Sequence, residues 1–208
     1  MCGRYYVDDG TAREIEKLVR QVDEGRQQGS LSFAALQAKD ICPTEIAPVL
    51  AASNTGSHLC CRMQRWGFLG QFSGSGHAGK KLVFNARCET VTEKPMFSAA
   101  VANRRAVIPA TWFYEWNHAK EKNIFSRRGG EVLFMAGFYD RYPDGEHFVI
   151  LTTQANESMR PVHDRMPLVL EEEDIRPWIL EPNRMMDFLG KKPCLLERKS
   201  PYEQLCLF

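Results

Sequence analysis

The feature that most constrains the fold is a series of short apolar runs between residues 81 and 154. The runs read KLVFNAR, RAVIPATWFYEW, NIFSRR, EVLFMAGFYD and HFVILTTQ. They are rich in β-branched and aromatic residues, and the Asp-Gly of YPDGEH favours a hairpin between the last two. An earlier run, CCRMQRWGFL, also has the character of a strand. We therefore expect a mostly antiparallel sheet, open or barrel-like.

Fewer segments have helical character. Thr11 and Glu14 have the spacing of a capping box, and the apolar residues that follow from Ile15 to Val22 recur at helical spacing. Further helices are expected near residues 95–103, 171–180 and 182–189, and exposed loops at 53–58 and 71–80. The prediction is a single α+β domain over residues 1–208, with helices flanking the sheet.

The N-terminal sequence MCGRYYVDD lacks the apolar stretch of a signal peptide, and no apolar run is long enough to cross a membrane. We expect an intracellular protein that is not membrane-bound: cytoplasmic and nucleoid-associated in a bacterium, nuclear in a eukaryote. The seven cysteines include no CxxC pair, so we expect free thiols and neither a metal nor another cofactor.

Charge is distributed unevenly along the chain, although the net charge is only +1. Residues 80–130 carry 10 basic and 4 acidic side chains, a net charge of +6. Residues 131–208 carry 9 basic and 14 acidic side chains, a net charge of −5. The middle of the chain is therefore a candidate surface for a polyanion, with an ordinary solvated face as the alternative.

The second residue, Cys2, is the first candidate for chemistry. If Met1 is removed, Cys2 carries a free α-amine next to its thiol. An α-amine has a pKa of about 7.7–8.0, against about 10.4 for lysine, so it is the better imine-forming group near neutral pH. The thiol can then add to the imine carbon and close a thiazolidine ring. Gly3 would allow close approach of a substrate to the backbone.

Three later segments carry polar residues in strand context. Asn85 and Arg87 lie two apart in VFNARCET and should share a face of a strand. Glu115 lies in the aromatic run TWFYEWNH, where a carboxylate should be partly desolvated and suited to general acid catalysis. His163, in RPVHDRMP, is a candidate proton shuttle. An outward-facing glutamate and a structural histidine are the alternatives.

Together these motifs are more specific than any one of them. The elements MCGR, NARCET, FYEW and HDRMP, in that order, resemble the SRAP family, the SOS response-associated peptidase family of abasic-site sensors. RWGFL, ICPTEIAPV and HFVILTTQAN resemble further elements of that family. Two departures stand out: Cys88 replaces the serine of a NARSET pattern, and Gln71-Phe72-Ser73 stands where a Pro-x-Trp sequence is expected beside bound DNA.

The resemblance implies a role for each matching residue. Cys2 would be the nucleophile that crosslinks to the ring-opened sugar, Asn85 would position the sugar or the amine, and Glu115 and His163 would be catalytic. Arg4, Arg87 and Arg165 would contact phosphates, with Trp66 and Gly67 beside the bound strand. The resemblance also implies that a monomer binds abasic sites in single-stranded DNA and at junctions with a duplex.

Two other functions remain open from the sequence. Cys2, His163 and Asn85 have the residue types of a Cys-His-Asn triad, so the chain could be a thiol peptidase, at least for removal of its own Met1. Alternatively it could bind single strands without catalysis, by stacking bases on exposed aromatic side chains: Trp66, Trp112, Phe113 and Trp116. A pure binder would not depend on Cys2.

Overall fold

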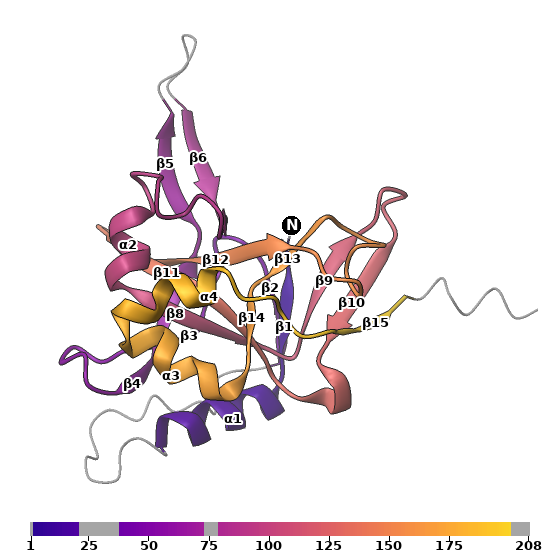
Figure 1. Ribbon diagram of the computed structural model, residues 1–208, viewed down its shortest axis with the longest axis horizontal. Coiled ribbons are helices and arrows are strands. Elements are labelled where there is room, and N and C mark those ends of the chain that lie inside the picture. The colour runs from indigo at the N-terminus through magenta and orange to yellow at the C-terminus, as the bar shows by residue number, and fades with distance from the viewer. Residues whose placement is uncertain (1, 21–37, 73–78, 201–208) are drawn as a thin grey trace, which may run out of the picture.

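The core of the fold is a small barrel. A computed structural model describes residues 2–20, 38–72 and 79–200 (Figure 1). Five strands close into a ring in the order β12-β4-β3-β8-β11, because β11 pairs with β12 as well as with β8. The strands of the ring are β3 (Ile46–Ala52), β4 (Leu59–Trp66), β8 (Arg105–Ala110), β11 (Leu133–Tyr142) and β12 (Gly145–Gln154).

Shorter strands extend this sheet at its margins. β7 (Asn85–Arg87) pairs in parallel with β12, β13 (Arg165–Pro167) pairs antiparallel with β12, and β14 (Val169–Leu170) pairs antiparallel with β11. β12 therefore brings together the strand that begins at Asn85 and the strand that begins at Arg165.

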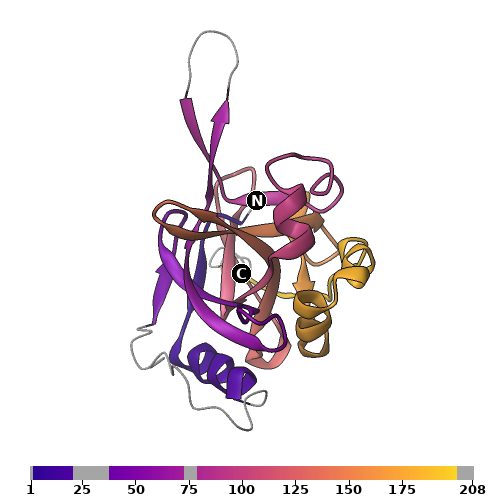
Figure 2. The same ribbon diagram turned by 90° about the vertical axis from the view of Figure 1, so that its left-hand side faces the viewer.

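A second sheet has the order β15-β10-β9-β1-β2. Its strands are β1 (Tyr5–Val7), β2 (Lys39–Ile41), β9 (Trp112–Trp116), β10 (Lys122–Ser126) and β15 (Glu197–Lys199). The hairpin of β5 (Phe68–Phe72) and β6 (Gly79–Val83) projects from the body in both views (Figures 1 and 2). The mixed α+β, barrel-like domain predicted from the sequence is confirmed.

Helices cover the outside of the barrel. They are α1 (Asp9–Arg20), α2 (Ser98–Asn103), α3 (Glu172–Leu180) and α4 (Met185–Leu189), with 3-10 turns η2 (Arg128–Gly130) and η3 (Pro182–Arg184). α3 packs on β3, β8 and β11, and Trp178 donates from Nε1 to the carbonyl of Ala106 at 2.9 Å. No described helix is long and apolar enough to span a membrane.

Both faces of β11 are buried, which explains its continuous apolar run. Leu133 and Met135 belong to one core cluster, which also contains Cys2, whereas Phe134 and Phe138 belong to a second cluster with α3 and α4. A strand buried on both faces loses the alternation of polar and apolar residues. The run VLFMAGF is therefore part of the core of the protein.

Several predicted boundaries are wrong. The first helix begins at Asp9, because Asp8 and not Thr11 is its cap: the Thr11 amide donates to Asp8 Oδ1 at 2.8 Å. Pro95 lies in a turn before α2, which begins at Ser98. The 71–80 loop is shorter than expected, because β5 continues to Phe72 and β6 starts at Gly79. The helical positions predicted at 21 and 22 lie outside the described residues.

Three runs that read as single strands are each divided in two. CCRMQRWGFL is broken at Gly67, whose φ is +116°, and KLVFNAR is broken at Phe84. RAVIPATWFYEW is broken at Thr111 and contributes β8 to the barrel and β9 to the second sheet. This last break places Glu115 near the N-terminal strand.

Candidate functional site

Cys2 lies three positions before Tyr5, the first residue of β1, and is fully buried. Its thiol donates to the Arg4 carbonyl over 3.7 Å. Burial raises the pKa of the Cys2 thiol far above its usual value, and the nearby carboxylate of Glu115 raises it further. The thiol therefore stays protonated near neutral pH, which is unlike the thiolate of a typical cysteine nucleophile.

Asn85 holds the backbone of Cys2 in place. Because β7 pairs with β12 at Ile150, the side chain of Asn85 reaches the N-terminal segment, and Nδ2 donates to the Cys2 carbonyl at 2.8 Å. Its other polar atom, Oδ1, is buried and has no hydrogen-bond partner within the described ranges. The Asn85 side chain thus fixes the backbone of Cys2 through the Cys2 carbonyl. Its Oδ1 atom is an additional acceptor near Cys2.

Glu115 is only 3% exposed and lies on the inner side of the second sheet, as does Phe113. The desolvation expected from its aromatic context is confirmed. Its charge contributes to the raised pKa of the Cys2 thiol, so the two side chains are close enough to interact electrostatically. The alternative of an outward-facing strand residue is wrong.

His163 ends the segment that connects β12 to β13. Met159 and Val162 of that segment belong to the same core cluster as Cys2. The Nδ1 atom of His163 lies 2.9 Å both from the Arg165 amide nitrogen and from Asp164 Oδ1. These neighbours thus fix the position of the His163 ring beside β13.

Arg165, which the resemblance implies is a phosphate contact, binds other groups of the protein in this structure. It is 8% exposed, and its guanidinium makes two bonds to the carboxylate of Glu89, at 2.7 and 2.8 Å. It also donates to the Thr152 carbonyl at 2.6 Å. Arg165 thus ties the end of the NARCET segment to the strand that follows His163. A phosphate would have to replace Glu89 to reach this side chain.

Trp66 also lies in an unexpected environment, since its side chain is fully buried. Nε1 donates to the Phe84 carbonyl at 2.9 Å, directly before Asn85, and the ring packs 5.2 Å from that of Tyr5. Trp66 therefore cannot stack on a base in this conformation; it supports the strand that carries Asn85. Gly67 provides the corner, where a Cβ would meet Leu82 Cδ1 at 2.6 Å.

The other two arginines that the resemblance implies as phosphate contacts, Arg4 and Arg87, are accessible. Arg4 is 41% exposed, lies 3.9 Å from Asp40 and places its guanidinium 5.9 Å from the ring centre of Trp116. Arg87 is exposed at the end of β7. These two arginines can reach a phosphate without rearrangement of the fold.

The four aromatic residues considered as stacking surfaces are not equivalent. Trp66 and Phe113 are buried, and Trp112 stacks on Tyr6 with 4.2 Å between ring centroids. Trp116, at 38% exposure, is the most accessible of the four. A binding function based on all four as exposed platforms is therefore not supported by their burial.

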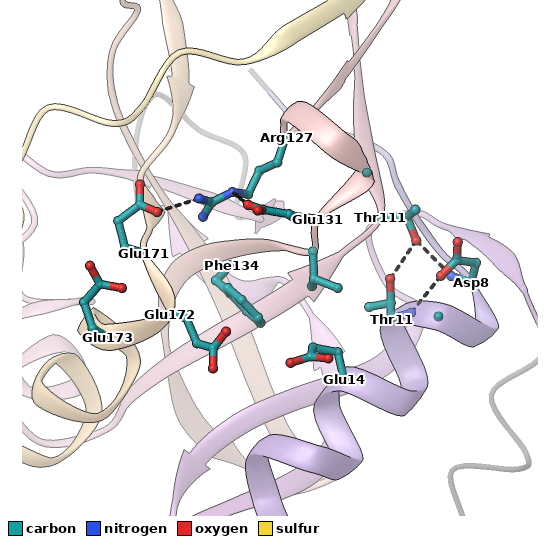
Figure 3. A pocket seen from close by; sticks show the side chains of 13 residues that line it. Asp8, Thr11, Glu14, Thr111, Arg127, Glu131, Phe134, Glu171, Glu172 and Glu173 are labelled. Atoms are coloured by element: carbon teal, nitrogen blue, oxygen red, sulfur yellow. Dashed lines mark hydrogen bonds and ion pairs between the residues drawn. The ribbon is translucent and has the colours of Figure 1, made fainter.

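A cavity of about 550 Å³ lies on another part of the molecule, between α1 and α3 (Figure 3). Its lining includes Asp8, Glu14, Glu131, Glu171, Glu172 and Glu173. The one cation in its lining, Arg127, pairs with Glu171 at 2.6 Å and with Glu131 at 3.1 Å. None of the predicted site residues lines this cavity, and its negative charge disfavours a polyanion.

Sequence reasoning overlooked two residues of the site region. Glu89 is part of the NARCET motif, so its identity was visible, but its partner Arg165 is 76 positions away. Tyr5 looked like an ordinary strand residue, yet its hydroxyl is buried beside Cys2 without a hydrogen-bond partner among the described residues. Among those residues no group of three or more His, Cys, Asp or Glu is arranged to hold a metal ion.

The comparisons with known proteins agree with one another. The model of the family described as "SOS response associated peptidase (SRAP)" matches residues 1–198. The abasic site processing protein YoqW of Bacillus subtilis is 30% identical over 200 residues, which cover 91% of this chain and 84% of YoqW. The abasic site processing protein YoaM of the same organism is 29% identical over 204 residues, which cover 91% and 83% of the two chains.

A solved structure supports the fold independently. The crystal structure of a protein from Bordetella bronchiseptica superimposes with a TM-score of 0.70 at 22% identity, covering 96% of this chain and 99% of that one. At this identity the likeness concerns the fold alone.

Proposed function

The chain belongs to the SOS response associated peptidase family, and on this premise we propose that it processes abasic sites by forming a covalent bond between Cys2 and the lesion. The relatives named abasic site processing proteins support the class of lesion. The observation that carries the chemistry is the assembly of Asn85 and Glu115, from distant parts of the chain, around Cys2. The proposed substrate is single-stranded DNA, including its junctions with duplex.

The proposed reaction starts after Met1 has been removed, by self-processing or by another enzyme. The α-amine of Cys2 adds to the aldehyde carbon C1′ of the ring-opened sugar, and the oxygen takes up a proton to give a carbinolamine. Loss of this hydroxyl as water leaves an imine. The Cys2 sulfur then bonds to C1′ while its proton passes to the nitrogen, which closes the thiazolidine ring.

The other residues of the site have roles in this sequence. Glu115 donates the proton that allows water to leave, and His163 moves protons during opening of the sugar and closure of the imine; each role is typically worth about 10²–10⁴-fold in rate. Asn85 holds the Cys2 backbone, and Arg4 and Arg87 hold flanking phosphates without reading sequence. Ring closure competes with β-elimination, so it suppresses the strand cleavage of a lyase.

The electrostatics of Cys2 favour this order of steps over thiol-first attack. A peptidase of the Cys-His type needs a thiolate, whereas burial and Glu115 both raise the pKa of the Cys2 thiol. An amine-first route needs the thiol only after the imine has formed, when it can transfer its proton to nitrogen. For this reason we propose that peptidase activity is limited to the removal of Met1.

The test is a crosslinking assay with a single strand that carries one abasic site. The mature protein should give a product that survives heat and denaturant without reductant, and peptide mapping should place the DNA remnant on Cys2. Cys2→Ser keeps the amine but should form little heat-stable product, and an imine that borohydride can reduce should remain. Cys2→Ala should behave similarly, with more strand cleavage.

Matched cysteine variants control for nonspecific thiol chemistry. Cys88→Ser alters another buried thiol of the NARCET segment and should crosslink normally, because Cys88 has no α-amine. Intact-mass analysis should show a mature chain without Met1. A crosslink of full yield in Cys2→Ala, or one that maps to a lysine, would refute the proposal.

A further inference from the structure

Tyr5 is a buried residue beside Cys2 to which the proposed chemistry assigns no role. Its side chain is fully buried on the inner side of β1, where Tyr5 pairs with Phe113 on one side and Ile41 on the other. The ring packs at 56° to Trp66, with 5.2 Å between centroids. Tyr5 and Cys2 belong to the same core cluster. The ring is thus held firmly, which fixes the direction of its hydroxyl.

The hydroxyl itself is not used by the fold. Within the described ranges it has no hydrogen-bond partner and almost no exposed surface. A buried polar group without a partner costs about 1–3 kcal/mol, so each such group in a native structure calls for an explanation. A phenylalanine would pack equally well against Trp66 without this cost.

Packing contacts place Tyr5 in the Cys2 region: its ring lies against Trp66, which binds the Phe84 carbonyl next to Asn85, the residue that holds Cys2. Burial raises the pKa of Tyr5 well above its usual value, and the charges that add to this effect are those of Cys2 and Glu45. The hydroxyl therefore remains a neutral donor near Cys2. Another buried atom without a described partner is Asn85 Oδ1, an acceptor on the residue that binds the Cys2 carbonyl. A donor and an acceptor, each without a described partner, thus belong to residues of the Cys2 region.

The Tyr5 hydroxyl as donor and Asn85 Oδ1 as acceptor could both bind a ligand oxygen that carries a hydrogen. We propose that Tyr5 is a substrate-binding residue whose hydroxyl donates to the oxygen on C1′ of the abasic sugar. This inference rests on the proposed function and adds a residue to it. As the amine adds, negative charge develops on the aldehyde oxygen, and a fixed donor in a water-poor site stabilises that charge more than it stabilises the free aldehyde.

The test is the variant Tyr5→Phe, which removes one oxygen and keeps the ring. Because the hydroxyl has no described partner, the melting temperature should be unchanged or slightly higher. Affinity for an intact strand should also be unchanged, since an intact strand presents no aldehyde. The rate of crosslinking at saturating DNA should fall roughly 10²-fold, as it does when one donor to a developing oxyanion is removed.

A matched control is Tyr139→Phe. Tyr139 is 5% exposed in β11 and belongs to the same core cluster, but it faces Arg62 and not Cys2; its variant should crosslink at the normal rate. A strand with a tetrahydrofuran analogue, which lacks the oxygen on C1′, should bind wild type and Tyr5→Phe equally. Equal crosslinking rates in wild type and Tyr5→Phe would overturn the inference alone. Absence of any wild-type crosslink would overturn the proposed function and the inference with it.

Discussion

The side chain of Cys2 is wholly buried, although a nucleophile needs access to its substrate. Asn85 binds Cys2 through the main-chain carbonyl, so neither the sulfur nor the α-nitrogen is consumed by this contact. In the proposed reaction, a substrate could therefore meet the sulfur and the α-nitrogen of the same residue. Glu115, at 3% exposure, lies within the same desolvated region, where an electrostatic interaction is stronger than in water.

The variant Glu115→Gln tests the electrostatic interaction between Glu115 and Cys2. Loss of the carboxylate should slow crosslinking by about 10²–10⁴-fold, because no acid then assists the departure of water. The same change should lower the pKa of the Cys2 thiol, since Glu115 raises it in the wild type. Thiolate absorbance measured against pH gives the second result. Glu121→Gln, altered in the loop after β9, should change neither quantity, and an unchanged rate in Glu115→Gln would exclude a catalytic role.

That Cys2, Asn85 and Glu115 are candidate site residues could be predicted from sequence, because the motifs contain them directly, and the structure brings the three together. The environment of two others could not be predicted. Arg165 and Trp66 looked like DNA contacts, but each is buried by partners far away in the chain: Glu89 for Arg165 and Phe84 and Tyr5 for Trp66. A local motif gives the residue type, whereas burial depends on which distant segments the sheet brings together.

At the level of elements, β12 organises the site, because β7 pairs with its residues 150–152 and β13 pairs with its residues 152–154. The apolar runs predicted most of these strands, but not the breaks at Gly67, Phe84 and Thr111. Each break lies inside an apolar run, and hydrophobic periodicity does not show where a run passes from one sheet to another. The capping error had a similar origin, since Asp8 and Thr11 are both acceptable caps and tertiary contacts decide between them.

The corner at Gly67 predicts a large effect of a small substitution. Gly67→Ala should lower the free energy of unfolding by about 2 kcal/mol, because its φ is +116° and its new Cβ meets Leu82. Gly56→Ala is the matched control: its φ is +72°, but nothing lies within 4 Å of the Cβ, so about 1 kcal/mol is expected. Denaturant melts of both variants provide the comparison, and equal losses would show that the Leu82 contact relaxes without cost.

The Glu89–Arg165 pair predicts a pH-dependent stability. Its hydrogen bonds with Arg165 hold the pKa of Glu89 below its ordinary value, which is about 4.3. A group whose pKa is lower in the folded state stabilises the protein above the ordinary pKa and loses that contribution as pH falls through the folded-state value. Glu89→Gln should therefore cost about 1 kcal/mol at neutral pH, a modest figure because the carboxylate is 42% exposed.

Melting temperatures measured between pH 7 and pH 2 test whether the stabilisation by Glu89 is lost as the pH falls. The difference between wild type and Glu89→Gln should be largest at neutral pH and should shrink below about pH 4. Glu93→Gln, at an exposed position in the same turn region, should match the wild type throughout. A difference that stays constant across the range would show that ionisation of Glu89 does not contribute.

On the scale of the whole molecule, charge is segregated. The acidic cavity between α1 and α3 draws most of its carboxylates from residues 131–208, the acidic part of the sequence (Figure 3). Arg4 and Arg87 lie with the Cys2 site. A charge distribution of this kind orients an approaching polyanion, and the orientation weakens as salt is added.

Salt dependence of strand binding measures this effect. On a single strand the slope of log K against log salt falls by about 0.7 for each phosphate contact that is lost. Arg87→Ala should reduce the slope by that amount. Arg13→Ala, on α1, should leave the slope unchanged, because Arg13 donates to the Asp9 carbonyl within its own helix. If both variants gave the wild-type slope, Arg87 would not contact phosphate.

The long-range pairing of β1 also has a consequence for biosynthesis. β1 forms its sheet with β9, which lies more than a hundred positions later, so Cys2 cannot be enclosed until the ribosome has passed Trp116. At about 5–20 residues per second this takes roughly 5–20 s. During that interval Cys2 is not yet enclosed, and after folding it is buried. An aminopeptidase that removes Met1, as the proposed function requires, would therefore act during translation, before β9 pairs with β1.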